Sequence, residues 1–278
     1  MSDFCVRRLG PKDEAPLEAF LDGLPRCHLY LRAAARRQGP EAFAAAAEDG
    51  RLVAVAHAGA PGSVVAAGKP AGIAALARDR SGAHDRSAAR APWRVLVGRD
   101  EETLAWLAAD GTAKAVSRRH PYLVLDALPA GAAKGESVER ATAGDFQALV
   151  RLALAFHRDD DPAGAAPRER KAVEARARAR IAAGTSWVLR RDGVPVFMAD
   201  VGAEEPSEGA LLGGVVTDPA FRRRGIAREG LGALCRRLMS RGMPAVALHV
   251  AEENAAARRL YAGVGFREID TFRVAWAT

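Results

Sequence analysis

The fold is decided by VVTDPAFRRRGIAREG, residues 215–230. Strand-forming valines come first, Pro219 ends the strand, and three consecutive arginines precede Gly225 and a segment with helical periodicity. The start of a helix exposes about four unpaired backbone N–H groups and about half a unit of positive charge. Gly225 has no Cβ to keep a ligand away from that backbone. The stretch therefore predicts a strand, a cationic turn and a helix whose N-terminus binds an anion such as a pyrophosphate.

An isolated Arg-x-x-Gly-x-Ala is a weak signal, because a solvated basic turn before an amphipathic helix has the same pattern. The helix itself is strongly indicated, since apolar residues recur at helical spacing on one face and charged residues occupy the other. The residues expected on the buried face are Ala227, Leu231, Leu234, Cys235, Leu238 and Met239.

The composition is that of a globular protein. Of the 278 residues 49% are hydrophobic and 27% charged, and the length suits two domains. No apolar run of about 18 residues occurs, so we expect no membrane span. The first residues lack the basic-then-apolar pattern of a secretory signal, and the three cysteines are widely spaced. We therefore expect a cytoplasmic protein with neither a disulfide framework nor a metal site.

The chain is basic, with a net charge of +7 and a pI near 9.8. The excess is spread over both halves and forms no basic tail. An arginine-rich composition explains such diffuse charge more simply than a nucleic-acid-binding patch, so we expect no nucleic-acid partner. The sequence leaves open whether the protein is a monomer or a homodimer.

The second half of the chain has a complete order of predicted elements. A segment containing proline and glycine, residues 126–139, separates the halves, so we place a boundary near residue 135 and expect domains 1–135 and 136–278. The pattern that follows predicts a strand, two helices, three strands, a helix, a strand, a helix and a closing strand, FREIDTFRVAWA. Asp192 and Gly193 indicate a two-residue hairpin turn.

The first half echoes this order. AEDGRLVAVAHAG, residues 47–59, repeats the Asp-Gly turn and alternating strand of RRDGVPVFMADVG, residues 190–202. We therefore predict an α/β (α+β) fold of two tandem copies, each a mixed, mostly antiparallel twisted sheet flanked by helices. The other elements predicted here are helices near 15–22, 27–37, 72–79 and 100–110, a strand at 93–98, and two strands ending in YLVLD.

The combination of motifs resembles the GNAT superfamily of acyl-CoA-dependent N-acetyltransferases. Its pyrophosphate loop, Q/R-x-x-G-x-G/A, is matched by Arg222, Gly225 and Ala227. The segment that leads into this loop, V-x-x-P-x-(aromatic)-R, is matched by Val216, Pro219, Phe221 and Arg222. The downstream motif, N-x-x-A-x-x-x-Y-x-x-x-G-F, is matched by Asn254, Ala257, Tyr261, Gly265 and Phe266. The layout also resembles a bacterial group in which a degenerate N-terminal GNAT-like domain precedes the catalytic one.

The resemblance implies where acetyl-CoA binds. The backbone of Val215 and Thr217 is expected to pair with the pantetheine arm, and a strand N–H polarises the thioester carbonyl, which contributes roughly 3–4 kcal/mol. Gly213 and Gly214 suit a bulge that separates this strand from its neighbour, although they could also merely relieve crowding. The expected coenzyme contacts are Val215, Val216, Thr217, Arg222, Arg223, Arg224, Gly225, Ile226, Ala227 and Arg228.

Two further residues are implied in catalysis. The phenol of Tyr261, with an ordinary pKa of about 10, suits protonation of the departing CoA thiolate. The alternative is a tyrosine that only packs above GVGF. Asn254 heads a helix, where asparagine is a favoured N-cap, and this role is compatible with a coenzyme contact.

The general base is left open by the sequence. An amine must lose a proton before attack, and several acids lie near the ends of the strands that flank the expected substrate cleft. Each is most simply interpreted as a surface acid in a turn, and a water relay can also serve as base. The candidates are Asp200, Glu204, Glu205, Glu208, Glu252 and Glu253.

Other reactive residues have simpler interpretations. His157 precedes the acidic RDDDP, but a solvated loop is favoured over a metal cluster. His249 is expected to pack or to meet solvent, and Cys235 to be inert core. The first half offers only Lys69, in VVAAGKPAGIAALA, at the position of the arginine turn. We expect that half not to hold CoA productively and to be structural, or to form one wall of the substrate site.

The function predicted from these observations is transfer of an acetyl group from acetyl-CoA to a primary amine, on a small molecule or a peptide, by direct attack. The absence of an obvious base keeps a non-catalytic acyl-CoA-binding or regulatory protein open. The two-domain layout keeps open a tandem-domain synthase that acylates the precursor of a small thiol.

Overall fold

The computed structural model describes residues 4–59, 62–79, 93–111, 115–129, 138–160 and 170–277. The chain forms two compact units. Unit 1 is Met1–Pro121 together with Asp270–Thr278, and unit 2 is Tyr122–Ile269. The boundary expected near residue 135 lies outside the described residues. The contacts do not divide the chain into two continuous halves, because its last residues belong to unit 1.

The elements of the first half follow the predicted order, with one difference. Two strands were expected to end in YLVLD, whereas a single strand passes through Pro121. The elements are β1 (Cys5–Arg8), α1 (Glu14–Asp22), α2 (Leu29–Gln38), β2 (Phe43–Glu48), β3 (Arg51–Gly59), β4 (Ser63–Gly68), α3 (Pro70–Arg78), β5 (Val95–Arg99), α4 (Asp100–Asp110) and β6 (Ala115–Leu125).

The second half repeats that order, which confirms the predicted internal duplication of elements. A parallel pair recurs at the same place, β4 with β5 in one unit and β10 with β11 in the other. The elements are β7 (Glu139–Arg140), α5 (Phe146–Asp160), α6 (Arg170–Ala183), β8 (Ser186–Arg191), β9 (Val194–Glu205), β10 (Gly209–Thr217), α7 (Ile226–Ser240), β11 (Val246–His249), α8 (Ala255–Val264) and β12 (Arg267–Ala277).

The two Asp-Gly hairpins have the same backbone conformation. Asp49 and Gly50 have φ of 50° and 77°, and Asp192 and Gly193 have φ of 50° and 77°. A tight hairpin turn with positive φ at both central residues matches the twist of the strands, and asparagine, aspartate and glycine tolerate it best. The sequence signal at both turns is thus confirmed.

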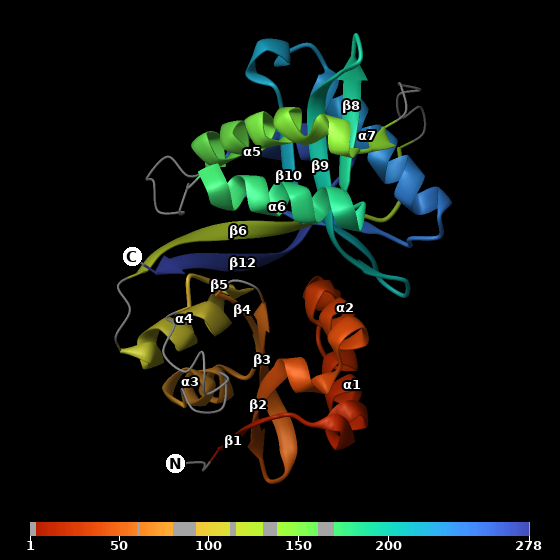
Figure 1. Ribbon diagram of the computed structural model, residues 1–278. Coiled ribbons are helices and arrows are strands. Elements are labelled where there is room, and N and C mark those ends of the chain that lie inside the picture. Colours follow the sequence, from red (N-terminus) through yellow and green to blue (C-terminus); the bar gives the residue numbers. More distant parts are fainter. Residues whose placement is uncertain are drawn as a thin grey trace. The chain divides into compact units, whose positions relative to one another are not determined.

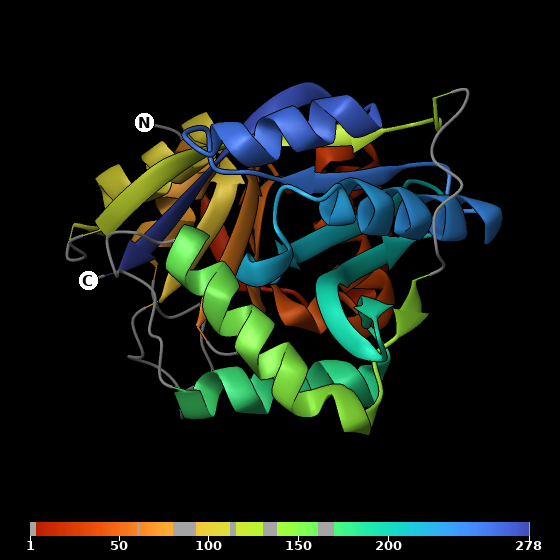
Figure 2. The same ribbon diagram turned by 90° about the horizontal axis from the view of Figure 1, so that it is seen from above.

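Unit 2 has helices on both faces of its sheet, as Figures 1 and 2 show. Alternate residues along its strands enter different apolar clusters: Val188 packs with α5 and α6, whereas its neighbours Trp187 and Leu189 pack with α7 and α8. This alternation follows from the two-residue period of a strand. The sheet therefore carries α5 and α6 on one face and α7 and α8 on the other.

Unit 1 has the same layers built from smaller side chains. In β2, Ala45 joins the cluster that contains α1 and α2, whereas Ala44 and Ala46 join the one that contains α3 and α4. Phe43 is among the few large side chains of this strand and is 1% exposed. Many of the alanines of unit 1 therefore lie in its sheet, between the two helical layers.

The last strand of each half of the sequence pairs with a strand from the other half. Tyr122–Leu125 of β6 pair with β11 in unit 2, and Phe272–Trp276 of β12 pair with β5 in unit 1. The expectation that FREIDTFRVAWA closes the second half is therefore corrected for its residues from Asp270 onward.

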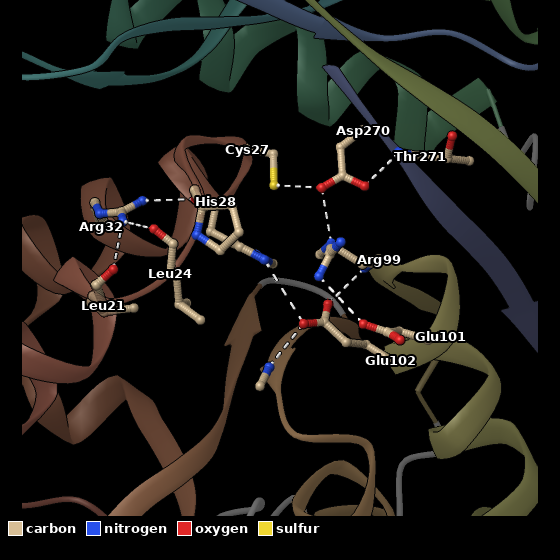
Figure 3. A network of polar contacts seen from close by, with 12 residues as sticks. Leu21, Leu24, Cys27, His28, Arg32, Arg99, Glu101, Glu102, Asp270 and Thr271 are labelled. Atoms are coloured by element: carbon tan, nitrogen blue, oxygen red, sulfur yellow. Dashed lines mark hydrogen bonds and ion pairs between the residues drawn. The ribbon is translucent and has the colours of Figure 1, made fainter. Parts of the chain in front are cut away.

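Asp270 anchors the start of the exchanged segment in unit 1 (Figure 3). Its carboxylate accepts a hydrogen bond from Arg99 Nε at 2.9 Å and one from the Cys27 thiol at 3.3 Å. Burial and the adjacent carboxylate raise the pKa of Cys27, so the thiol stays protonated and donates. A charged pair and a thiol from different elements thus hold the strand where it enters the sheet.

We predict that the fragment 136–278 folds poorly, because it lacks the strand that covers the edge of β11. Tyr122 and Leu125 are each 1% exposed, and burial of such side chains contributes about 1.5–3 kcal/mol apiece. Removing the strand takes away a large part of the roughly 5–15 kcal/mol that stabilises a domain. Size-exclusion chromatography and thermal unfolding should show association and a lower Tm than for the control fragment 119–269. A monomer as stable as that control would contradict the strand exchange.

Candidate functional site

A β-bulge lies in β10. Gly213 pairs with Asp200 of β9, and the next pair along the strands joins Val216 to Met198, so β10 has one residue more than its partner between them. Gly214 has a φ of 58°, a left-handed conformation that favours glycine. A Cβ on Gly214 would lie 2.6 Å from Asp200 Oδ2. The bulge predicted from the two glycines is therefore present, and Gly214 is required by both φ and space.

Beyond the bulge, β10 is paired on one side only. The parallel ladder with β11 runs from Ala210 to Leu212, whereas the ladder with β9 continues to Thr217. Residues 213–217 therefore present backbone N–H and C=O groups on the side that β11 no longer covers. An extended ligand could add to this edge in the manner of a strand.

The arginine turn connects β10 to α7. Arg223 and Gly225 have φ of 60° and 80°, and Gly225 is the N-cap of α7. A Cβ on Gly225 would meet no described atom within 4 Å. The backbone N–H groups of residues 223–228 donate no hydrogen bond to any other described residue. The turn therefore offers the donors that an anion needs.

The arginines of the turn have different roles. Arg222 donates to Thr217 O at 3.3 Å and pairs with Asp159 at 2.5 Å, which fixes the turn against β10 and α5. The Arg224 guanidinium lies 5.5 Å from the ring centre of Phe221. Arg223 is exposed and pairs with no acid in the described part of the chain. The positive potential before α7 thus exceeds what its own acids neutralise.

The remaining predicted residues lie on α8. Asn254 is the N-cap, and its Oδ1 accepts from Ala257 N at 3.0 Å, so its capping role is confirmed. Tyr261 is 6% exposed and packs at 5.9 Å, edge to face, on Phe266. It belongs to the same apolar cluster as Ile226, the first residue of α7. The start of α7 and Tyr261 of α8 therefore pack into the same apolar layer of unit 2.

A pocket opens on the other side of the bulge. It encloses about 510 Å³, part of it open to solvent, and its walls come from α5, α6 and strands β8, β9 and β10. Gly214 lies at its floor beside Asp200, whose carboxylate accepts from Ser186 Oγ and Arg180 Nη1. Arg176 contributes a further guanidinium to the lining. Ser186, Arg176 and Arg180 were not predicted as site residues.

The structure separates Asp200 from the other candidate bases. Asp200 is 2% exposed inside β9, and burial raises its pKa although Arg180 and Ser186 favour the ionised form. Glu205 is also buried, but it accepts from Ser207 in the hairpin turn. Glu204 lies 3.8 Å from Arg241, away from the pocket lining. The interpretation as surface acids is therefore wrong for Asp200 and Glu205.

The other acids and reactive residues have no shared site. Glu208, Glu252 and Glu253 are not among the residues that line the pocket. His249 packs edge to face on Tyr122 at 4.8 Å, and Cys235 is fully buried, where burial raises its pKa to about 12. The acidic run after His157 falls partly outside the described residues. Among the residues that are described, no His, Cys, Asp and Glu cluster could hold a metal ion, and no helix is long and apolar enough to cross a membrane.

The equivalent position in unit 1 is closed. Only Lys69 separates β4 from α3, and Pro70 at the start of α3 has no N–H to offer. Glu102 accepts from Gly68 N at 2.9 Å and from Arg99 N at 2.7 Å, so one carboxylate joins the ends of β4 and β5 (Figure 3). Burial raises the pKa of Glu102 to about 7. This arrangement favours the prediction that unit 1 holds no CoA.

The fold and the site define a class of protein. Residues 147–266 match the family model described as Acetyltransferase (GNAT) family. A segment of 60 residues, 22% of the chain, is 40% identical to the [Ribosomal protein bS18]-alanine N-acetyltransferase of Haemophilus ducreyi, and it spans 41% of that relative's length. Residues 147–266 are therefore similar to the acetyltransferases of the GNAT family.

Solved structures share the fold over nearly the whole chain. A GCN5-related N-acetyltransferase from Sphaerobacter thermophilus has a TM-score of 0.60 at 19% identity, over 98% of this chain and 94% of that one. A tandem GNAT protein from the clavulanic acid biosynthesis pathway has a TM-score of 0.54 at 16% identity, over 99% of each chain. These likenesses extend the fold to both units.

We predict that Gly214→Ala destabilises the protein by about 2 kcal/mol or more, because the left-handed φ and the contact with Asp200 both oppose a Cβ. The matched control is Gly213→Ala, whose Cβ would meet no atom within 4 Å and whose φ is not positive. Its free energy of unfolding should change by no more than about 0.5 kcal/mol. Chemical denaturation measures both. Equal losses in the two variants would contradict the described bulge.

Proposed function

We propose that unit 2 transfers an acetyl group from acetyl-CoA to a primary amine of a small molecule or peptide, without a metal. The observation that carries the proposal is the bulge at Gly214, which lies between a pocket and a strand edge that leads to the arginine turn. Three free cysteines, two of them buried, support a reducing compartment such as the cytoplasm.

Acetyl-CoA fits the residues around the turn. Its diphosphate is assigned to the N–H groups of residues 223–228, whose donors are unused and whose surface is open. Arg223, Arg224 and Arg228 surround these groups with positive charge. The pantetheine amides are assigned to the uncovered edge of β10 at Val215–Thr217, where backbone groups can pair with them. Asn254 caps α8 through its Oδ1, and its amide nitrogen donates to no described residue.

The reaction we propose has one transfer step. The neutral amine attacks the thioester carbonyl carbon, a C–N bond forms, and the C–S bond breaks. A backbone N–H near Val215–Thr217 stabilises the developing oxyanion by roughly 3–4 kcal/mol. Tyr261 gives its proton to the departing thiolate, and the proton released by the amine goes to Asp200, directly or through water. Asp200 is our choice of base because it alone among the candidates lines the pocket, and its raised pKa favours proton uptake.

Two other functions remain as alternatives. A non-catalytic acyl-CoA-binding protein would keep the turn but need neither Tyr261 nor the pocket. A tandem-domain synthase that acylates the precursor of a small thiol is favoured only by the duplicated order of elements. The pocket beside the bulge favours an enzyme, because a binding protein has no use for a second site next to the thioester.

We predict that Gly225→Ala raises the Kd for acetyl-CoA at least about tenfold, because a Cβ then stands before the N–H groups of the turn. Gly242→Ala is the matched control, since Gly242 lies at the other end of α7 with a φ of 90° and open space around it. Titration calorimetry should show unchanged affinity for that control. The proposal fails if the wild-type protein binds no acetyl-CoA at millimolar concentration.

We predict that Tyr261→Phe slows release of free thiol from acetyl-CoA by about 10²-fold or more, because it removes the acid and keeps the ring packed on Phe266. A thiol-reactive dye follows the rate, and calorimetry verifies that acetyl-CoA still binds. Equal rates for the two proteins would remove Tyr261 from the mechanism and favour the non-catalytic alternative.

A further inference from the structure

The pocket beside the bulge carries more positive than negative charge. Two guanidinium groups and one carboxylate line it, from Arg176, Arg180 and Asp200. Arg180 is already engaged with Asp200 in an ion pair. Arg176 makes no hydrogen bond or ion pair with another described residue. Among the described residues, the pocket therefore contains one ion pair and one guanidinium that has no ion-pair partner.

The two arginines face the same space. They are four residues apart on α6, so their side chains lie on one face of the helix with their Cβ atoms about 5–6 Å apart. Burial and the neighbouring charge of Arg180 lower the pKa of Arg176, whereas the carboxylate of Asp200 acts in the opposite direction. The rest of the lining has the imidazole of His157 and the hydroxyl of Ser186 as its polar groups. It is otherwise formed by Gly214 and by the apolar residues Leu149, Ala153, Phe156, Val173, Ala177 and Met198.

Building on the proposed function, we infer that the acceptor is an amine that also carries an anionic group, which Arg176 binds while Asp200 receives the ammonium end. A guanidinium forms paired hydrogen bonds with a carboxylate or a phosphate and is only weakly hydrated, so it suits this role. A second cationic group on the acceptor meets Arg176 and is repelled. The pocket thus selects amines by the sign of their second charge.

The test compares amines of one shape with different charge. The probes are L-leucine, L-leucinamide and 3-methylbutylamine, which share the apolar body and differ in the carboxylate. A second pair, O-phosphoethanolamine and ethanolamine, distinguishes phosphate from carboxylate. Thiol release from acetyl-CoA gives kcat/KM for each probe, expressed per concentration of neutral amine. We expect kcat/KM to be at least tenfold higher for L-leucine or for O-phosphoethanolamine than for the matched amines that lack the anionic group.

The variants assign that preference to residues. Arg176→Gln should abolish it by lowering kcat/KM for the anionic probe at least about tenfold more than that for 3-methylbutylamine. Arg178→Gln is the matched control, because Arg178 lies on the same helix with its guanidinium 4.4 Å from the Phe146 ring centre, outside the pocket lining. It should leave the preference intact. Asp200→Asn should lower kcat for every probe alike. A preference that is absent, or that survives Arg176→Gln, would overturn the inference.

A direct binding measurement separates this inference from the proposed function. Calorimetric titration of the protein saturated with CoA should show that L-leucine or O-phosphoethanolamine binds and that Arg176→Gln weakens it at least tenfold. Such binding without turnover would leave the pocket's selectivity standing and remove the transferase. Acetyl-CoA binding with no binding of either anionic amine would overturn the inference and leave the coenzyme site standing.

Discussion

The site depends on one extra residue in β10. The bulge at Gly214 lets the strand leave β11 while it stays paired with β9, so backbone groups are freed on one side. On the other side the same residue brings the strand against the buried carboxylate of Asp200. A Cβ at this position would meet that carboxylate. The glycine is therefore needed for the uncovered strand edge, for the pocket that Asp200 lines and for the ion pair of Asp200 with Arg180.

The two units show how one scaffold can be opened or closed by a few residues. In unit 2 the segment 218–225 separates strand from helix, and Ala257, at the third position of α8, has no side chain to bridge the strands. In unit 1 a single lysine separates them, and Glu102 holds the third position of α4. A carboxylate there binds the N–H groups of both strand ends. The two units therefore differ in whether a carboxylate of the protein itself accepts from the backbone N–H groups at the strand ends.

Much of the fold could be predicted from the sequence because local signals were strong. The Asp-Gly turns at Asp49–Gly50 and Asp192–Gly193 each fix a backbone conformation through short-range physics. The arginine turn before α7 was also visible as a local pattern. The strand exchange was not, since FREIDTFRVAWA has the pattern of a strand in whichever sheet it pairs.

The pocket residues could not be predicted for a similar reason. A two-residue turn at Asp192–Gly193 places Ser186 opposite Ala199, but a register shift between Leu189 and Arg190 places it opposite Asp200 instead. The sequence carries no signal for that shift. Arg176 and Arg180 belong to an arginine-rich helix, and the sequence does not show that Arg180 is the one that pairs with Asp200. The composition of this pocket was thus set by register rather than by motif.

The exchanged strands also bear on why the first copy persists. After a duplication, a copy without the diphosphate turn is normally free to accumulate substitutions and disappear. Here each copy supplies the last strand of its sister, so loss of the first would leave the second with an uncovered sheet edge. Neither sheet is therefore complete without backbone from the other copy, whatever ligand each copy binds.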